Sequence, residues 1–240
     1  MDDIIKNDFV LFLQQKVNGA LEEVGYEILL RDSKDNHCFP VLKFEEVRNN
    51  QAYYLAFLTW FEVEIGRLLD NYPKSSFSIN FTRAELFYDE TMALLDRIKA
   101  NSDRLTIEVT EEVVINFRLV TEIKGKSFIS QLKKIKEMGY QVSIDDISSG
   151  QNSVGAILEW LPYIDELKIS HVNFLKLGLE RQALASLIEF WQSFCEKNRL
   201  RLVIEGIEEE AVFNQLKKQG LTLFQGFYFS MPFQGMGTNR

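Results

Sequence analysis

Short apolar runs end in an acid, an amide or a lysine at intervals along this chain. One architecture, the (β/α)8 barrel, brings the carboxyl ends of many strands to a single mouth. Carboxylates that meet there repel one another unless something positive lies among them, and one or two divalent metal ions can supply that charge. The residues at these run ends are Glu27, Asn80, Glu108, Asp145, Asp146, Lys168, Glu205 and Gln225.

Each of these residues also has a simpler structural explanation when it is taken alone. A glutamate after a strand is usually a surface acid, and Thr110 can cap a helix that begins just after Glu108. Capping explains an acid or a serine after a strand. It does not explain Asn80, Lys168 and Gln225 in the same structural position, so the set as a whole favours one shared site.

Hydrolysis of a phosphate ester is the chemistry that such a cluster suits. Two metal ions roughly 3.5–4 Å apart can share a carboxylate, activate a bridging water and neutralise charge on phosphorus. The adjacent Asp145 and Asp146 suit a bridging and a terminal ligand, and Lys168 can orient the water. A glycosidase also uses two carboxylates on a barrel, but it does not need this many acids together with an asparagine and a lysine.

Length and composition restrict the class of protein further. The 240 residues suit one barrel domain over 1–240, and a net charge of −8 argues against DNA or RNA as a partner. A nucleotide ligand stays compatible with that charge, because metal ions can neutralise phosphate. The widely separated Cys38 and Cys195 form no CxxC pair and suit a reducing cytoplasm. No signal peptide or membrane span is evident, so we expect a cytoplasmic protein without membrane insertion.

The order of the expected elements favours a barrel. An apolar run over 9–17, a turn at Asn18-Gly19 and a strand over 24–30 predict an antiparallel hairpin, after which strands and helices alternate. That alternation allows a doubly wound sheet or a barrel, and the lack of a glycine-rich phosphate loop weakens the former. The expected helices are Gln51–Leu69, Arg83–Lys99, Lys126–Met138, Ser153–Trp160, Gln182–Lys197 and Glu209–Lys218.

Eight segments carry these residues in a fixed order. They are LQQKV (13–17), EILLR (27–31), INFT (79–82), EVTE (108–111), DDISSG (145–150), LKIS (167–170), EGIE (205–208) and QGFYF (225–229) followed by Pro232. They are similar to the motifs YQPxV, EALLR, VNLS, EITE, DDFGTG, IKID, EGVE and QGYYFxxP. Over nearly its whole length the chain therefore resembles the EAL family of cyclic di-GMP phosphodiesterases.

The resemblance implies a modified TIM (β/α)8 barrel whose first strand is antiparallel. It also implies hydrolysis of cyclic di-GMP to linear pGpG with Mg²⁺ or Mn²⁺, two ions per active site, in a chain able to form a homodimer. Lys168, Glu205 and Asp145 would be catalytic, and Gln14, Leu30, Arg31 and Gln225 would bind substrate. Glu111 and Glu208 would support the ligands from behind, Glu111 by holding the loop after Asp146. The implied metal ligands are Glu27, Asn80, Glu108, Asp145, Asp146 and Glu205.

Departures from the family motifs leave other functions open. Ile147, Ser148 and Ser149 replace phenylalanine, glycine and threonine in a loop that the family uses for dimerisation and metal-site assembly. A serine adopts some glycine conformations only with strain. Ser170 replaces an aspartate, which removes one acid from the rim. The alternatives to an enzyme are therefore a non-catalytic cyclic di-GMP receptor and a regulator that binds a protein partner, while the intact ligand set favours the enzyme.

Overall fold

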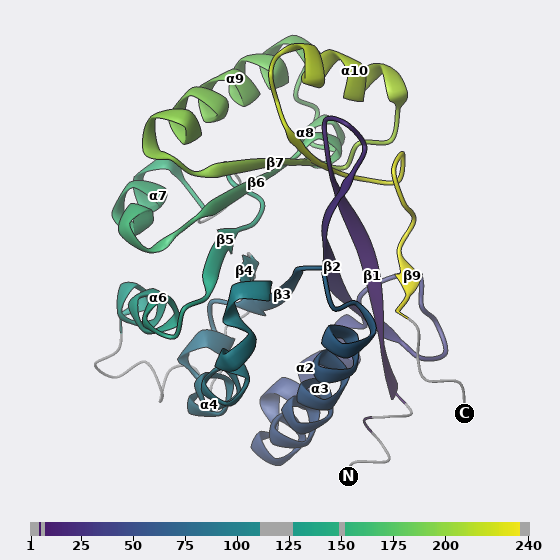
Figure 1. Ribbon diagram of the computed structural model, residues 1–240, viewed down its shortest axis with the longest axis vertical. Coiled ribbons are helices and arrows are strands. Elements are labelled where there is room, and N and C mark those ends of the chain that lie inside the picture. The colour runs from purple at the N-terminus through teal and green to yellow at the C-terminus, as the bar shows by residue number, and fades with distance from the viewer. Residues whose placement is uncertain (1–4, 6–7, 111–126, 149–151, 236–240) are drawn as a thin grey trace.

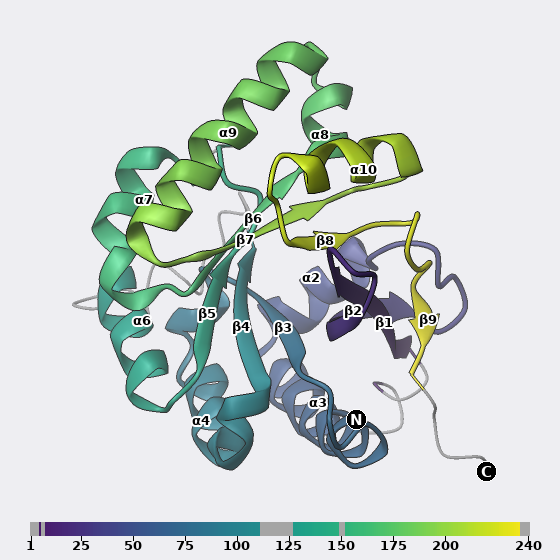
Figure 2. The same ribbon diagram turned by 45° about the horizontal axis from the view of Figure 1, so that its top comes forward.

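The chain folds into a closed barrel of strands with helices outside it (Figures 1 and 2). The computed structural model describes residue 5 and residues 8–110, 127–148 and 152–235. Among these, the strands are β1 Phe9–Asn18, β2 Glu23–Asp32, β3 Phe77–Thr82, β4 Leu105–Thr110, β5 Gln141–Ile144, β6 Glu166–Ser170, β7 Arg201–Glu205, β8 Leu223–Gln225 and β9 Phe233–Gln234. Strands β2 to β8 follow one another in the sheet, and β1 closes the barrel between β8 and β2.

The antiparallel first strand is confirmed. β1 runs antiparallel to β2 and to β8, whereas the strands from β2 to β8 run parallel to one another. The turn after β1 forms because the Asn18 side-chain oxygen accepts hydrogen bonds from the backbone N–H groups of Ala20 and Glu22, at 2.8 and 3.0 Å. The hairpin places Gln14 opposite Glu27.

Most of the expected helices are present, with two additions and one correction. The described helices are α2 Val41–Asn49, α3 Gln51–Asn71, α4 Asp89–Ile98, α6 Phe128–Glu137, α7 Val154–Trp160, α8 His171–Lys176, α9 Arg181–Asn198 and α10 Glu210–Lys218. The sequence did not predict α2 or α8. Lys126, the expected start of α6, lies outside the described residues. In the described ranges, no helix has both the length and the apolar content that a membrane crossing requires.

The expected helix over Arg83–Lys99 was wrong at its start. The Glu85 carboxylate turns back and accepts hydrogen bonds from the backbone N–H and the hydroxyl of Thr82, at 2.9 and 2.8 Å. The Glu85 N–H donates in return to the Thr82 hydroxyl at 3.2 Å, and these reciprocal bonds cap a short 3₁₀ turn over Glu85–Phe87. Tyr88 is then extended, and α4 begins only at Asp89.

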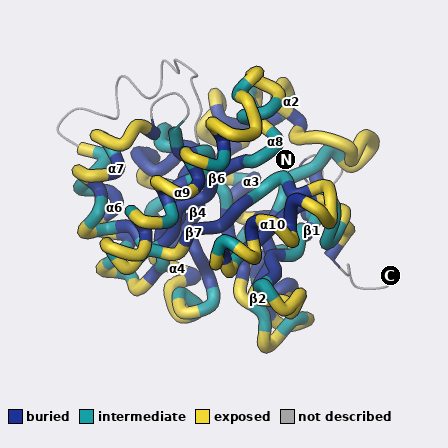
Figure 3. The backbone as a smooth tube through the Cα atoms, turned by 90° about the horizontal axis from the view of Figure 1, so that it is seen from above, coloured by how far each residue is buried: buried dark blue, intermediate teal, exposed yellow. Residues whose placement is uncertain are grey.

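Strands β3 to β8 are mostly buried on both faces, as a parallel sheet covered by helices requires. Figure 3 shows the strands mostly buried inside a shell of helices whose outer turns are exposed. Ile79, Ile107 and Ile204 are each 0% exposed. In such a core the polar residues at the strand ends face the barrel interior or its mouth.

A layer of charge lies inside the barrel, below the predicted site. The Lys16 ammonium donates a hydrogen bond to the Ser78 hydroxyl at 2.6 Å and lies 3.4 Å from the Glu166 carboxylate. Arg201 reaches the other Glu166 oxygen at 3.2 Å. Residues two apart on a strand face the same side, so Ser78 and Glu166 lie one layer beneath Asn80 and Lys168.

The Lys16–Glu166 pair allows a test of the fold that is independent of the mouth. Lys16→Met keeps the length of the side chain but removes the buried cation of Glu166 and leaves the half-exposed Arg201 as its remaining ion-pair partner among the described residues. We expect the free energy of unfolding in urea at neutral pH to fall by about 3 kcal/mol or more, because a buried charge loses its partner.

The double variant Lys16→Met/Glu166→Gln serves as the control. It also removes the stranded carboxylate, so it should be more stable than Lys16→Met alone. A single variant as stable as the wild type, or a double variant less stable than the single one, would show that the pair does not stabilise the barrel.

Candidate functional site

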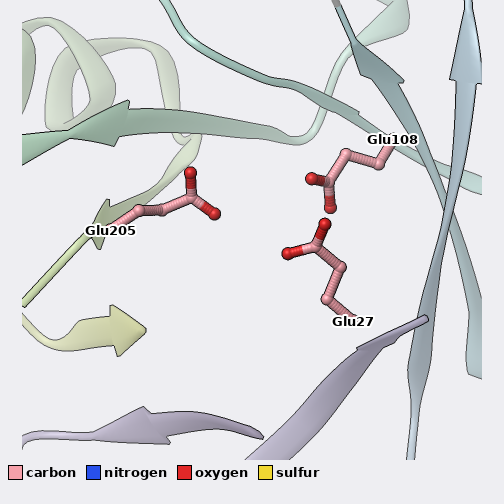
Figure 4. Close-up of side chains that lie close together, drawn as sticks. All are labelled: Glu27, Glu108 and Glu205. Carbon is pink, nitrogen blue, oxygen red and sulfur yellow. The ribbon is translucent and has the colours of Figure 1, made fainter. Parts of the chain in front are cut away.

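The strand-end residues predicted from the sequence meet at one mouth of the barrel. Figure 4 shows the carboxylates of Glu27, Glu108 and Glu205 pointing toward a common centre from three different strands. Lys168 extends from β6 into this centre and is fully buried. The parallel strands bring these four residues together although they lie far apart in the sequence.

The Lys168 ammonium lies among the acids. Its Nζ is 3.2 Å from a Glu27 oxygen and 3.9 Å from an Asp145 oxygen, and it forms ion pairs with Glu108 and Glu205. Burial lowers the pKa of Lys168, but the charges of Glu108, Glu205 and Glu27 outweigh it and raise that pKa well above its ordinary value. The lysine is therefore protonated at neutral pH.

Glu27 accepts hydrogen bonds from two buried or half-buried amides. Asn80 donates to one carboxylate oxygen at 2.8 Å, and Gln225 donates to the other at 2.7 Å. Burial alone would raise the pKa of Glu27, but Lys168 and these two amides hold it well below its ordinary range. Glu27 is therefore ionised inside the barrel mouth.

The pKa values of Glu108 and Glu205 are raised, in contrast to that of Glu27. Burial raises the pKa of both carboxyl groups, and the negative charge of Glu27 adds to the rise for Glu108. The attraction of Lys168 acts against the rise in both cases, but one ammonium cannot balance this number of carboxylates. The cluster is therefore short of positive charge.

The donor set fits divalent cations. Two groups of acids in the described part of the chain offer oxygens within 4.8 Å of one another: Glu27, Glu108 and Glu205 form one group, and Asp145, Asp146 and Glu205 form the other. Among the described residues, Asn80 Oδ1 and Glu108 Oε2 are buried oxygens without a hydrogen-bond partner. Carboxylate and amide oxygens are the ligands that Mg²⁺ and Mn²⁺ prefer.

The loop after β5 carries two of these acids in an unusual backbone conformation. Asp146 and Ser148 have positive φ angles of 45° and 67°, so the strain expected from serine in place of glycine falls on Ser148. The Ile147 N–H donates to the Lys168 carbonyl at 3.1 Å, and its side chain is fully buried. Asn173 of α8 donates to an Asp146 carboxylate oxygen at 3.3 Å.

Asn152 holds the same loop from the other side. This fully buried residue donates from its amide to the Asp145 carbonyl at 2.6 Å and accepts a hydrogen bond from Arg83. The Arg83 guanidinium lies 4.5 Å from the centroid of the Trp160 ring, over its face. A chain of contacts therefore runs from α7 to the first aspartate. Neither Asn152 nor Asn173 stands in a sequence pattern that reveals its role.

The predicted substrate residues line the mouth. A cavity of about 540 Å³ is bounded by Gln14, Arg31, Gln225 and Glu208, and the Gln225 amide donates to Gln14 at 3.1 Å. Leu30 instead borders a neighbouring, more apolar cavity of about 530 Å³. Glu111 lies outside the described residues.

Ser170, which stands where the family motif has an aspartate, has a structural role. Ser170 is buried, and its hydroxyl caps the N-terminus of α8 by accepting a hydrogen bond from the Asn173 N–H at 3.3 Å. Serine is among the preferred N-cap residues. The replacement of aspartate at this position therefore keeps a side chain able to cap the helix.

The chain is similar to proteins of the EAL domain family. The sequence model of the EAL domain matches residues 1–232. A relative from Vibrio cholerae, named cyclic di-GMP phosphodiesterase CdgJ, is 24% identical over 91% of this chain and 43% of its own length. The chain spans less than half the length of the curated relatives that match at least 90% of its residues.

Solved structures share the fold. An EAL domain protein from Listeria monocytogenes superposes with a TM-score of 0.71 at 25% identity, covering 97% of this chain and 92% of that protein. BlrP1 from Klebsiella pneumoniae, solved as a manganese/cy-diGMP complex, gives a TM-score of 0.71 at 24% identity over 93% of this chain and 56% of its own. At this identity the second likeness shows the fold alone.

The raised pKa of Glu108 predicts how the stability of the cation-free protein depends on pH. Folded Glu108 keeps a proton at pH values at which the unfolded chain has lost it, so stability should fall as pH rises above the ordinary glutamate pKa of about 4.3. Glu108→Gln imitates the protonated form and should remove part of this slope, up to about 1.4 kcal/mol per pH unit.

Urea unfolding in the presence of a chelator, between about pH 5 and pH 8, measures this slope. Glu137→Gln makes the same chemical change at an exposed position of α6 and should keep the wild-type slope. An unchanged slope in Glu108→Gln would mean that Glu108 is ionised in the folded state across this range.

Proposed function

The chain belongs to the EAL domain family, and on that premise we propose that it hydrolyses cyclic di-GMP to linear pGpG with the help of two divalent cations, Mg²⁺ or Mn²⁺. The observation that carries this proposal is the pair of acidic groups that share Glu205 beside a buried lysine. A shared carboxylate suits a pair of cations that lie close together. The name of the Vibrio cholerae relative supports the choice of substrate.

The cation-binding residues would be those whose oxygens converge on the mouth. The cations, when bound, would favour ionisation of a water molecule and neutralise charge on the phosphate. Asn80 suits this role because its amide N–H₂ group already holds Glu27, which leaves its oxygen free of hydrogen bonds within the described residues. The full set would be Glu27, Asn80, Glu108, Asp145, Asp146 and Glu205.

Lys168, Asp145 and Glu205 would handle the attacking water. The Lys168 ammonium would donate a hydrogen bond to the water or to a phosphate oxygen and fix its position. The carboxylate of Asp145 or that of Glu205 would accept the one proton that the water loses. The new bond joins the water oxygen to phosphorus, and the bond to one ribose oxygen breaks. That oxygen leaves with the electron pair of the broken bond and takes up a proton from solvent, which opens the ring.

Arg31 would bind a substrate phosphate. It lies half-buried at the mouth, its guanidinium donates to the Leu30 carbonyl at 3.0 Å, and it forms no ion pair with any described residue. A guanidinium without a carboxylate partner can bind a phosphate through two hydrogen bonds. Gln14, Leu30 and Gln225 would contact the rest of the nucleotide, while Glu208 would support the site from the rim.

The proposal predicts metal-dependent product. The purified chain, incubated with cyclic di-GMP and Mn²⁺ or Mg²⁺, should form pGpG that chromatography detects. Glu27→Ala should lower the rate by about 100-fold or more, because the cluster loses a ligand and the partner of Asn80, Gln225 and Lys168. Glu137→Gln should keep the wild-type rate.

A folded wild-type chain that forms no pGpG would overturn the enzymatic proposal. Saturable binding of cyclic di-GMP without turnover would then identify a receptor. The absence of binding would point to a regulator that acts on a protein partner.

Arg31→Ala predicts a change in substrate affinity. The KM for cyclic di-GMP should rise about tenfold, since one charge-assisted hydrogen-bond pair is lost, while kcat should change less. Arg31→Lys should recover part of the affinity because it keeps the charge without the planar fork. An unchanged KM in Arg31→Ala would show that the guanidinium does not bind the phosphate.

A further inference from the structure

We propose that Trp191 of α9 is a positioning residue for the cation site. Its indole N–H holds Ser148 in the turn that follows Asp145 and Asp146, and it thereby fixes these two carboxylates. The inference rests on the proposed function, because it concerns the acids that would bind the cations. Trp191 lies in no motif that the sequence analysis used.

The hydrogen bond is formed by a rigid donor. Trp191 Nε1 donates to the Ser148 hydroxyl at 2.6 Å, and the Trp191 ring is fully buried. Phe190 and Phe194 pack edge-on against this ring, each with a centroid distance of 5.2 Å. A buried indole N–H requires an acceptor, and the Ser148 hydroxyl supplies it.

Ser148 needs such a partner because of its backbone. At a φ of 67° it occupies the left-handed region, which a residue with a Cβ atom enters only at a cost in free energy. Glycine enters this region freely. The bond from Trp191 offsets the cost for serine, and the Ser148 N–H is held as well, by the Asn152 carbonyl at 3.1 Å.

The position of Ser148 determines that of the two acids. Asp146 is only two residues away, and its own φ of 45° is also left-handed. The intervening Ile147 fits a buried site and bonds to the Lys168 carbonyl. A turn with two left-handed residues is costly in free energy and is kept by the contacts around it. Release of Ser148 would let the turn relax and would move Asp146 away from Glu205.

The test compares Mn²⁺ affinity, measured by titration calorimetry on the full chain, across a set of variants. Ser148→Ala keeps the Cβ atom but removes the acceptor, and it should weaken Mn²⁺ binding about fivefold to tenfold. Ser148→Gly removes the acceptor and the strain together, so its affinity should lie within about threefold of the wild type.

Trp191→Phe removes the donor from the other side of the same bond. It should weaken Mn²⁺ binding as Ser148→Ala does, and Ser148→Gly added to Trp191→Phe should restore the affinity. Trp191→Phe also shrinks a buried ring and lowers the unfolding midpoint, and Ser148→Gly cannot refill that space. Rescue of affinity without rescue of the midpoint therefore separates positioning from support of the core.

The Mn²⁺ affinities test the positioning role of Trp191, and the turnover assay tests the proposed function. If Trp191→Phe lowers the unfolding midpoint and leaves Mn²⁺ affinity unchanged, the positioning role is overturned, and the same holds if Ser148→Ala binds Mn²⁺ like the wild type. A wild type that binds Mn²⁺ without forming pGpG overturns the proposed function, while the order of affinities still decides the role of Trp191. A wild type that binds no Mn²⁺ contradicts both proposals.

Discussion

The structure depends on the balance of charge around one buried ammonium. Lys168 contacts Glu27, Glu108, Glu205 and, at 3.9 Å, Asp145, and its single positive charge cannot neutralise them all. The amides of Asn80 and Gln225 stabilise the charge on Glu27, while burial raises the pKa of Glu108 and Glu205. A protein that keeps this arrangement has a strong attraction for cations at the centre of its barrel mouth.

The strands of the barrel hold these groups in place. The hairpin of β1 and β2 closes the barrel and sets Gln14 opposite Glu27. The layer below the mouth is also charged, but there Lys16 and Glu166 balance one another. The barrel thus has a lower layer whose carboxylate is paired with Lys16 and Arg201, and an upper layer that is short of positive charge. Asp145 and Asp146 do not lie within a strand, and their loop is held by backbone bonds to β4 and β6 and by the side chains of Asn152, Asn173 and Trp191.

The sequence predicted the barrel and the residues that meet at its mouth because both follow from local rules. Apolar runs predict buried strands, and parallel strands bring their carboxyl ends together. Asn152, Asn173 and Trp191 could not be found in this way, since their contacts with the Asp145–Ser148 loop arise only in the folded chain. The start of α4 was placed too early because apolar spacing continues through 83–88, where a short 3₁₀ turn over Glu85–Phe87 ends in an extended Tyr88.

The central claim is that the acids of the mouth bind two cations that share Glu205. Anomalous diffraction from a crystal of the chain with Mn²⁺ and cyclic di-GMP tests it most directly. The account predicts two manganese peaks in the mouth, both in contact with Glu205, with Asn80 and Glu108 among the ligands of one and Asp146 among those of the other. A mouth that binds cyclic di-GMP with no manganese peak near Glu205 would contradict the account.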